Sequence, residues 1–208
     1  MPDSPRARRK RTDGEQSRER ILDAATEIAA GRGYEGTSIA LVSKKCGLPA
    51  SSIYWHFKDK DDLLAAVIER SFGSWLQAWI LPAEGEPRNR VTTLATQIAK
   101  ALLDSPDFLR LGLMLALERR PVEPRAREMF LSVRAQAAES LQVALGEFAP
   151  GLDTAQLRQL VTYAIAGADG LFIAKEIGGD SVDLLGLFEL HASALYDTAQ
   201  RMLADGAS

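Results

Sequence analysis

Several kinds of residue and segment are scarce in this sequence, and each scarcity argues against a class of protein. Cys46 is the only cysteine, so no disulfide can form within the chain. Histidine occurs twice, as His56 and His191, which argues against a metal site built from histidines. The longest apolar run, residues 111–117, is far shorter than the roughly 20 residues of a membrane-spanning helix. We therefore expect no metal, no cofactor and no membrane partner.

Short motifs of enzyme chemistry are also missing. The sequence has no phosphate-binding loop, no G-x-S-x-G and no H-E-x-x-H. A site made only of carboxylates stays open, but we expect no catalytic residue. The polar, arginine-rich N-terminus is not followed by the apolar stretch of a secretory signal. These features predict a cytoplasmic, non-enzymatic protein.

Charge is distributed unevenly along the chain. The net charge is −3, but residues 1–60 hold 12 Lys and Arg against 8 Asp and Glu, whereas residues 61–208 hold 13 against 20. A cationic head on an anionic body can place the head on phosphate and keep the body off it. A basic tail on an acidic globule is the other interpretation, and charge alone does not choose between them.

The hydrophobic pattern predicts an all-α fold of about nine helices. No stretch alternates apolar and polar residues over the length of a strand. The first helix is expected at residues 17–32, stopped by Gly31 and Gly33, after a disordered basic arm at residues 1–15. Further helices are expected at about residues 38–47, 49–57, 60–79, 88–104, 106–119, 123–148, 153–178 and 181–204.

Residues 37–57 (TSIALVSKKCGLPASSIYWHF) have the pattern of a helix-turn-helix. Thr37 or Ser38 can cap the first short helix. Gly47 can make the turn because glycine tolerates a positive φ, and Cys46 before it is expected to be a small buried residue. A unit of this kind lays its second helix in the major groove of DNA while the first helix crosses the backbone.

The second short helix is expected to have an inner and an outer face. Ile53 and Phe57 lie four residues apart and can anchor it inward. Hydroxyls on the outer face can contact base edges or phosphates, and rings can lie against sugars and thymine methyl groups. The alternative is that the aromatic residues are core and His56 is a packed histidine. The outer face is expected to present Ala50, Ser51, Tyr54 and Trp55.

The sequence here resembles the TetR family of bacterial regulators. The resemblance covers about residues 17–64 and is most specific at Ser52-Ile53-Tyr54-Trp55-His56-Phe57-x-x-Lys60-x-x-Leu63-Leu64. It also includes a first helix with Ile21, Leu22, Ala25 and Ile28, the approach Gly33-Tyr34-x-Gly36-Thr37-Ser38, and the turn Cys46-Gly47-Leu48.

This resemblance implies roles for the matching residues. Contact with phosphates is implied for Ser38, Tyr54, His56 and Lys60, and contact with bases for Ala50, Ser51 and Ser52. The sequence departs from the family pattern in having Pro49 where a serine cap is frequent and Ala50 where a longer polar side chain often reads a base. Base reading is therefore expected to depend more on Trp55, Ser51 and the basic arm.

The resemblance also implies that the C-terminal part binds an effector and forms a dimer. We expect an arm at residues 1–15, a helix-turn-helix DNA-binding domain at 16–62, and a helical effector-binding and dimerisation domain at 63–208. The last two helices are the dimer candidates, since Gly167 and Gly170 disfavour a helix and suit close approach by another. Packing inside one chain is the alternative. The candidate interface residues are Leu160, Ala164, Gly167, Ala168, Leu171, Leu184, Leu187, Phe188 and Leu195.

A hydrophobic effector is expected to lie among aromatic and methionine side chains, although such residues are also typical of plain core. The candidates are Trp75, Trp79, Phe108, Met114, Phe130, Tyr163, Phe172 and His191. Glu118 and Asp169 are further polar residues that could orient a ligand.

The favoured hypothesis is a repressor that binds a palindromic operator in double-stranded DNA as a homodimer and is released by a small hydrophobic effector of unknown identity. The first alternative is a DNA-binding activator, or a regulator without a small-molecule inducer. A ligand cavity would separate these two. The alternative from another class is a helical adaptor, which salt-sensitive binding to a specific duplex would exclude.

Overall fold

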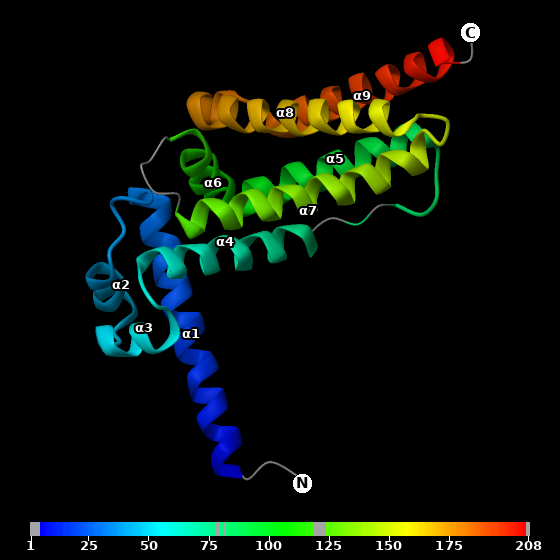
Figure 1. The fold of residues 1–208 in the computed structure, drawn as a ribbon. Coiled ribbons are helices and arrows are strands. Elements are labelled where there is room, and N and C mark those ends of the chain that lie inside the picture. The colour runs from blue at the N-terminus through cyan, green and yellow to red at the C-terminus, as the bar shows by residue number, and fades with distance from the viewer. Residues whose placement is uncertain (1–4, 78–79, 81, 119–123, 207–208) are drawn as a thin grey trace. The chain divides into compact units, whose positions relative to one another are not determined.

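The structure is a computed structural model that describes residues 5–77, 80, 82–118 and 124–206. Within these residues it has nine α-helices, one 3-10 helix and no strand, which confirms the all-α prediction. The helices are α1 (Pro5–Arg32), α2 (Ile39–Cys46), α3 (Ala50–His56), α4 (Lys60–Gln77), α5 (Pro87–Asp104), α6 (Asp107–Leu117), α7 (Arg125–Phe148), α8 (Thr154–Gly178), η1 (Gly179–Ser181) and α9 (Leu184–Gly206) (Figure 1).

The first helix differs most from the prediction. Helix α1 begins at Pro5, so the backbone of residues 5–15 is helical and the expected disorder there is wrong. Arginine, lysine and alanine all favour helices, and the prediction gave their charge more weight than this preference. Of the two glycines expected to stop the helix, Gly31 lies inside it. Gly33 ends it with φ 68°, and its N–H donates to the carbonyl of Ala29 over 2.8 Å.

The chain forms two compact units. The first contains residues 1–72 and 107–132, and the second contains residues 73–106 and 133–208. These units do not divide the chain at the expected position between residues 62 and 63. Helix α4 stays with the first unit through Phe72, and α6 and the first turns of α7 join it.

The core of the first unit comes from α1 to α4. Ile21 of α1, Val42 of α2, Ile53 of α3 and Leu63 of α4 are fully buried and belong to one cluster. The two short helices α2 and α3 therefore pack on longer neighbours, because helices of this length are not stable alone.

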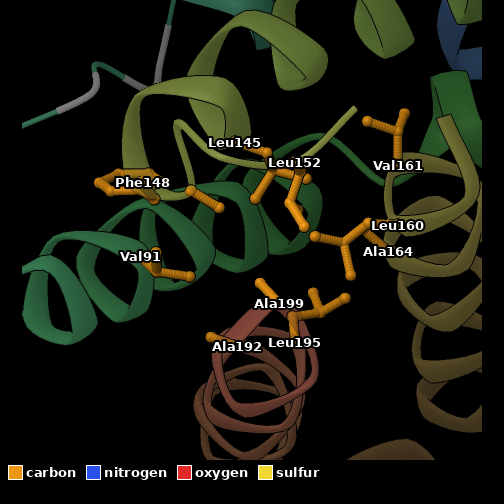
Figure 2. Packing of buried hydrophobic residues seen from close by; sticks show 11 residues of the cluster. Val91, Leu145, Phe148, Leu152, Leu160, Val161, Ala164, Ala192, Leu195 and Ala199 are labelled. Atoms are coloured by element: carbon orange, nitrogen blue, oxygen red, sulfur yellow. The ribbon is translucent and has the colours of Figure 1, made fainter. Parts of the chain in front are cut away.

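The core of the second unit comes from α5, the end of α7, α8 and α9. Figure 2 shows Val91 of α5, Phe148 of α7, Leu160 of α8 and Leu195 of α9 around one apolar interior. The start of α8 is fixed by a capping box, in which Asp153 and Gln156 each accept the other's main-chain N–H. No helix in the described ranges is both long and apolar enough to cross a membrane.

Candidate nucleic-acid interface

The turn between α2 and α3 is held by hydrogen bonds from two helices. Gly47 adopts φ 67° as predicted, and its N–H donates to the carbonyl of Ser43 over 3.0 Å. The Ser43 hydroxyl donates to the carbonyl of Leu48 over 2.7 Å. From α1, Arg20 Nη2 donates to the carbonyl of Cys46 over 2.7 Å. Cys46 is a buried free thiol, as expected of a small core residue.

Helix α3 has the two predicted faces. Ile53 is fully buried, and Phe57, just after the helix, is 3% exposed. On the other side, Tyr54 is 56% exposed and Trp55 is 74% exposed. The alternative that these two rings are core residues is therefore wrong, whereas Phe57 does belong to the core.

Small side chains lie at the entries of both short helices. Ser38 caps α2 by accepting a main-chain N–H over 3.3 Å, and because it stays exposed, its hydroxyl proton remains available to a phosphate. Pro49 is the N-cap of α3 and supplies no side-chain hydrogen bond to it. In the first turn of α3, Ser51 is exposed, and Ala50 and Ser52 are half-buried.

His56 lies at the end of α3 against its aromatic neighbours. Its ring meets the Trp55 ring edge-on, with centroids 4.5 Å apart. Burial, and secondly the positive charge of Arg18, lower the pKa of the His56 imidazole below its ordinary value of 6.5. At neutral pH the ring is therefore uncharged, and it would meet a phosphate as a hydrogen-bond donor.

Lys60 has partners within the chain that the sequence did not predict. Its Nζ donates to the carbonyl of Tyr34 over 3.2 Å and lies 4.3 Å from the centroid of the Tyr34 ring. It is also 3.6 Å from a carboxylate oxygen of Glu35. An ammonium group has three N–H donors, so one hydrogen bond leaves capacity for a phosphate.

Asp61 is a positioning residue that the sequence analysis missed. In the structure one carboxylate oxygen accepts the N–H of Arg125 over 2.5 Å, and the other accepts the N–H of Ala126 and the hydroxyl of Tyr34, each over 3.1 Å. Asp61 thus caps α7 from the start of α4. No signal in the sequence links residues about 64 positions apart.

Arg70 is a second such residue. Its Nη1 lies 2.9 Å from Glu19 and 2.8 Å from Asp23, and its Nη2 donates to Thr26 Oγ1 over 3.1 Å. These contacts tie α4 along one side of α1, the helix that also carries Arg20. The orientation of α3 therefore depends on polar side chains outside the helix-turn-helix segment.

The expected effector residues lie in both compact units. In the first unit, the Phe108 ring lies 6.2 Å from Phe130 and both are buried, whereas Met114 is half exposed and Glu118 exposed. A methyl group at Gly112 would lie 2.0 Å from the Phe130 ring, so this glycine lets the ring pack on α6. These contacts show a packed aromatic cluster and leave the effector role as a prediction.

In the second unit, Tyr163 and His191 lie together, with ring centroids 5.8 Å apart, and His191 Nε2 is 3.0 Å from the carbonyl of Ala164. Phe172 is buried and Trp75 is half-buried, whereas Trp79 lies outside the described residues.

Asp169 forms a two-point ion pair with Arg134 of α7. Burial raises the pKa of the Asp169 carboxyl, and the Arg134 guanidinium opposes this only in part. The Asp169 oxygens are already engaged by Arg134, which was not foreseen when Asp169 was named as a polar ligand residue.

The expected dimer residues divide into two groups. Five of them are buried within the single chain and have little surface left for a partner, so the alternative of intrachain packing holds for Leu160, Ala164, Leu184, Phe188 and Leu195. Ala168, Leu171 and Leu187 are half-buried. A methyl group at Gly167 would lie 2.2 Å from the His191 ring, so this glycine serves the approach of α9 in the same chain. Gly170 is exposed, with no atom within 4 Å of an added methyl group.

The comparisons with known proteins agree with this geometry. The pattern of the family described as "Bacterial regulatory proteins, tetR family" matches residues 21–67. An HTH-type transcriptional repressor of Mycobacterium tuberculosis is 31% identical over 130 residues, which is 62% of this chain and 50% of that protein. The chain therefore aligns with only half the length of this relative. The regulator AcrR of Shigella flexneri is 37% identical over 65 residues, 31% of this chain and 30% of its own.

Solved structures share the fold over most of the chain. The fatty acid degradation regulator FadR of Bacillus halodurans has a TM-score of 0.71 at 17% identity, covering 94% of this chain and 97% of its own. Its identity is too low to carry function, but it extends the structural likeness beyond residues 21–67. Together, the helix-turn-helix, the family match and the relatives show that residues 21–67 of this chain are similar to the DNA-binding segment of the tetR family of bacterial regulatory proteins.

Proposed function

We propose that this chain represses transcription by binding a palindromic DNA operator as a homodimer, with α3 in the major groove, and that a small hydrophobic effector releases it. The observation that carries the proposal is the exposure of Tyr54 and Trp55 on the side of α3 opposite Ile53. Large rings held open to solvent on a short, well-anchored helix are typical of a binding surface.

The composition of α3 limits how it can read bases. Its seven residues, ASSIYWH, include no Arg, Lys, Asn or Gln, the side chains that make two-point hydrogen bonds with guanine or adenine. The Ser51 hydroxyl would instead form a hydrogen bond with an acceptor on a base edge. The rings of Tyr54 and Trp55 would lie against thymine methyl groups. Phosphate contacts from Ser38, Tyr54, His56 and Lys60 would fix the register on the duplex.

For the dimer, the exposed face of α8 is a better candidate than the residues expected from the sequence. Apolar and small residues recur on it at spacings of three and four, as in a helix-helix seam. Leu190 of α9 is exposed as well. Two copies of α8 and α9 would form a four-helix interface around a two-fold axis. The α8 face consists of Tyr163, Ala166, Gly170, Ile173 and Ile177.

The effector is proposed as a class only. A regulator FadR of Bacillus subtilis has been solved with stearoyl-CoA, and a regulator of Saccharomonospora viridis with choline. Both share this fold at 20% identity with a TM-score of 0.67. One ligand has a long acyl chain and the other is a small cation, so the shared fold does not indicate which ligand this chain binds. The aromatic residues of α6 and α7 favour an apolar one.

Selection of bound sequences from a random duplex pool at fixed salt tests the proposal. A two-fold symmetric consensus whose half-sites lie about 34–36 Å apart is expected, because two α3 helices would meet successive major grooves. An unsymmetrical consensus would argue against the dimer, and no enrichment would favour the adaptor alternative.

Lys60 allows a sharper test of the phosphate contacts. If Lys60 contacts a phosphate, Lys60→Ala weakens binding and lowers the slope of log affinity against log salt by about one. If Lys60 only holds the carbonyl of Tyr34, affinity falls without a change in slope. Lys100→Ala, an exposed lysine of α5, is the control and should change neither.

A further inference from the structure

Tyr34, in the turn between α1 and α2, contacts Lys60 through two of its groups. Its carbonyl accepts a hydrogen bond from Lys60 Nζ over 3.2 Å, and the centroid of its ring lies 4.3 Å from the same nitrogen. An ammonium group over an aromatic ring is attracted to the ring's electrons, more strongly when it is partly desolvated, and the Lys60 side chain is half-buried. The position of Tyr34 therefore sets the position of the Lys60 ammonium group.

The contact between Lys60 and Glu35 is weaker. The Glu35 carboxylate lies 3.6 Å from Lys60 Nζ, and its side chain is exposed. Ion pairs that are exposed to water contribute little to stability, so a DNA phosphate can take the place of this carboxylate while the contacts with Tyr34 stay as they are. Tyr34, and not Glu35, would therefore determine where Lys60 meets a phosphate.

Tyr34 is held at its main chain and at the tip of its side chain. Its carbonyl also accepts the N–H of Thr37 over 3.3 Å, which closes the turn before α2. Its hydroxyl donates to one carboxylate oxygen of Asp61 over 3.1 Å. A hydrogen bond to a charged acceptor is stronger than one between neutral groups. The orientation of the Tyr34 ring, and with it the position of Lys60, therefore depends on Asp61.

The first turn of α7 holds Asp61 at the start of α4 (Figure 1). The N–H of Arg125 donates to one Asp61 oxygen over 2.5 Å, and the N–H of Ala126 donates over 3.1 Å to the oxygen that also accepts the Tyr34 hydroxyl. A carboxylate at the start of a helix is also favoured by the helix dipole. Polar contacts therefore run without interruption from the first turn of α7 through Asp61 and Tyr34 to Lys60.

We infer that Tyr34 is a positioning residue for the phosphate contact of Lys60, and that the first turn of α7 determines this position through Asp61. The inference rests on the proposed function and deepens it, because operator affinity would then depend on a helix outside the helix-turn-helix. In this arrangement Tyr34, Asp61 and α7 act on operator binding through Lys60 and need no DNA contact of their own.

A double-mutant cycle on the selected operator tests the role of Tyr34. Tyr34→Phe keeps the ring and the main-chain carbonyl but loses the hydrogen bond to Asp61. It should lower operator affinity by about threefold to tenfold, the range expected for one hydrogen bond, and lower the slope of log affinity against log salt. With Lys60→Ala already present, the same substitution should change neither quantity. The matched control is Tyr196→Phe in the second unit, where Arg88 lies 4.8 Å from the ring centroid, and it should leave binding unchanged.

Two substitutions at Arg125, the first residue of α7, test the part played by that helix. Proline is tolerated at the first position of a helix and has no N–H. Arg125→Pro therefore removes the main-chain hydrogen bond to Asp61 together with the ion pair between Arg125 and Asp62, whereas Arg125→Ala removes the ion pair alone. Arg125→Pro should bind the operator about threefold more weakly than Arg125→Ala, and this difference should disappear in the presence of Lys60→Ala.

Proton NMR of the protein without DNA measures the same geometry independently of binding. Protons above an aromatic ring resonate upfield of their usual position, so the methylene protons next to Lys60 Nζ should lie upfield of those of the exposed Lys100. Tyr34→Phe and Arg125→Pro should each move the Lys60 protons toward the Lys100 position, whereas Arg125→Ala should not. A loss of stability alone would leave this chemical shift unchanged.

The outcomes separate the inference from the proposed function. If Tyr34→Phe keeps wild-type affinity, or lowers affinity equally with and without Lys60, the inference is wrong while operator binding stands. The same holds if Arg125→Pro and Arg125→Ala bind the operator equally, or if the Lys60 protons resonate with those of Lys100. If wild-type protein selects no duplex, the proposed function fails and the inference fails with it.

Discussion

The two compact units are held together in different ways. In the first unit, polar side chains bridge separate elements: Arg70 joins α4 to α1, and Asp61 of α4 caps α7. In the second unit, ion pairs also join α5 to α9 and to α7, through Arg88 with Asp197 and Arg90 with Glu147, but the long helices share an apolar core along their length, and a cap such as Asp153 serves its own helix. The Arg134–Asp169 ion pair joins α7 to α8 in this unit.

This difference follows from helix length. Helix α3 has 7 residues and Ile53 is its only buried one, so apolar contact alone cannot fix its direction. Helix α8 has 25 residues and buries four of them. A short helix whose exposed face must keep a fixed orientation needs polar contacts with neighbouring elements. A long helix is aligned by the repeated apolar side chains along its buried face.

The largest effect is expected from truncating the anchor of α3. Ile53→Ala and Leu160→Ala both remove a buried branched side chain, and each should cost about 2–5 kcal/mol of unfolding free energy. Only Ile53→Ala should also release its helix locally, seen as fast amide exchange across α3. If amide exchange were equally slow in α3 and α8 in both variants, the difference described between the two units would be contradicted.

The next effect concerns two helical glycines, one in each unit. Gly112→Ala would push a methyl group into the Phe130 ring, which is buried against Phe108, and should destabilise the protein by about 1–3 kcal/mol. Gly146→Ala in α7 meets no atom within 4 Å and should stabilise it by about 0.5–1 kcal/mol. Thermal or denaturant unfolding measures both, and the same sign for the two would contradict the packing described for α6.

A smaller effect is expected from the caps. Asp61→Ala removes the cap of α7 and should cost about 0.5–2 kcal/mol, with faster amide exchange in the first turn of α7 and in α4. Asp153→Ala should cost a similar free energy, with faster exchange at the start of α8 alone. If Asp61→Ala left α4 unaffected, Asp61 would be a local cap and not a brace between elements.

The smallest effect is a pH dependence at His56. Its pKa in the folded protein is lowered, so the unfolded chain binds the proton more readily. The neutral ring therefore contributes stability above about pH 6.5, and this is lost as the pH falls below 6.5 toward the folded-state pKa. His56→Gln should flatten the stability profile in this window, and a profile unchanged by the substitution would contradict the burial of the ring.

Much of the fold could be predicted from the sequence because its signals are local. After α1, the helix bounds agree with the expected ones to within about three residues, since glycines, prolines and caps such as Asp153 mark them. The inner and outer faces of α3 followed from the spacing of Ile53 and Phe57. The turn at Gly47 followed from the freedom of glycine at positive φ.

What could not be predicted depends on contacts between distant residues. The spacing of apolar residues showed that α8 and α9 would be buried, but a broad apolar helix does not reveal which side meets its own chain. Leu160 and Ala164 were therefore expected at a dimer seam and lie in the core. Nothing in the sequence pairs Asp61 with the start of α7, or Lys60 with the carbonyl of Tyr34.

The exposed face of α3 is tested most directly by an equilibrium binding titration of Tyr54→Ala on the selected operator. Val143→Ala, at an exposed apolar residue of α7, is the control. The account predicts that Tyr54→Ala lowers affinity by about tenfold or more, which corresponds to the roughly 1–3 kcal/mol of a good nucleic-acid contact, while folding and oligomeric state stay as in the control. Wild-type affinity in a folded Tyr54→Ala protein would contradict it.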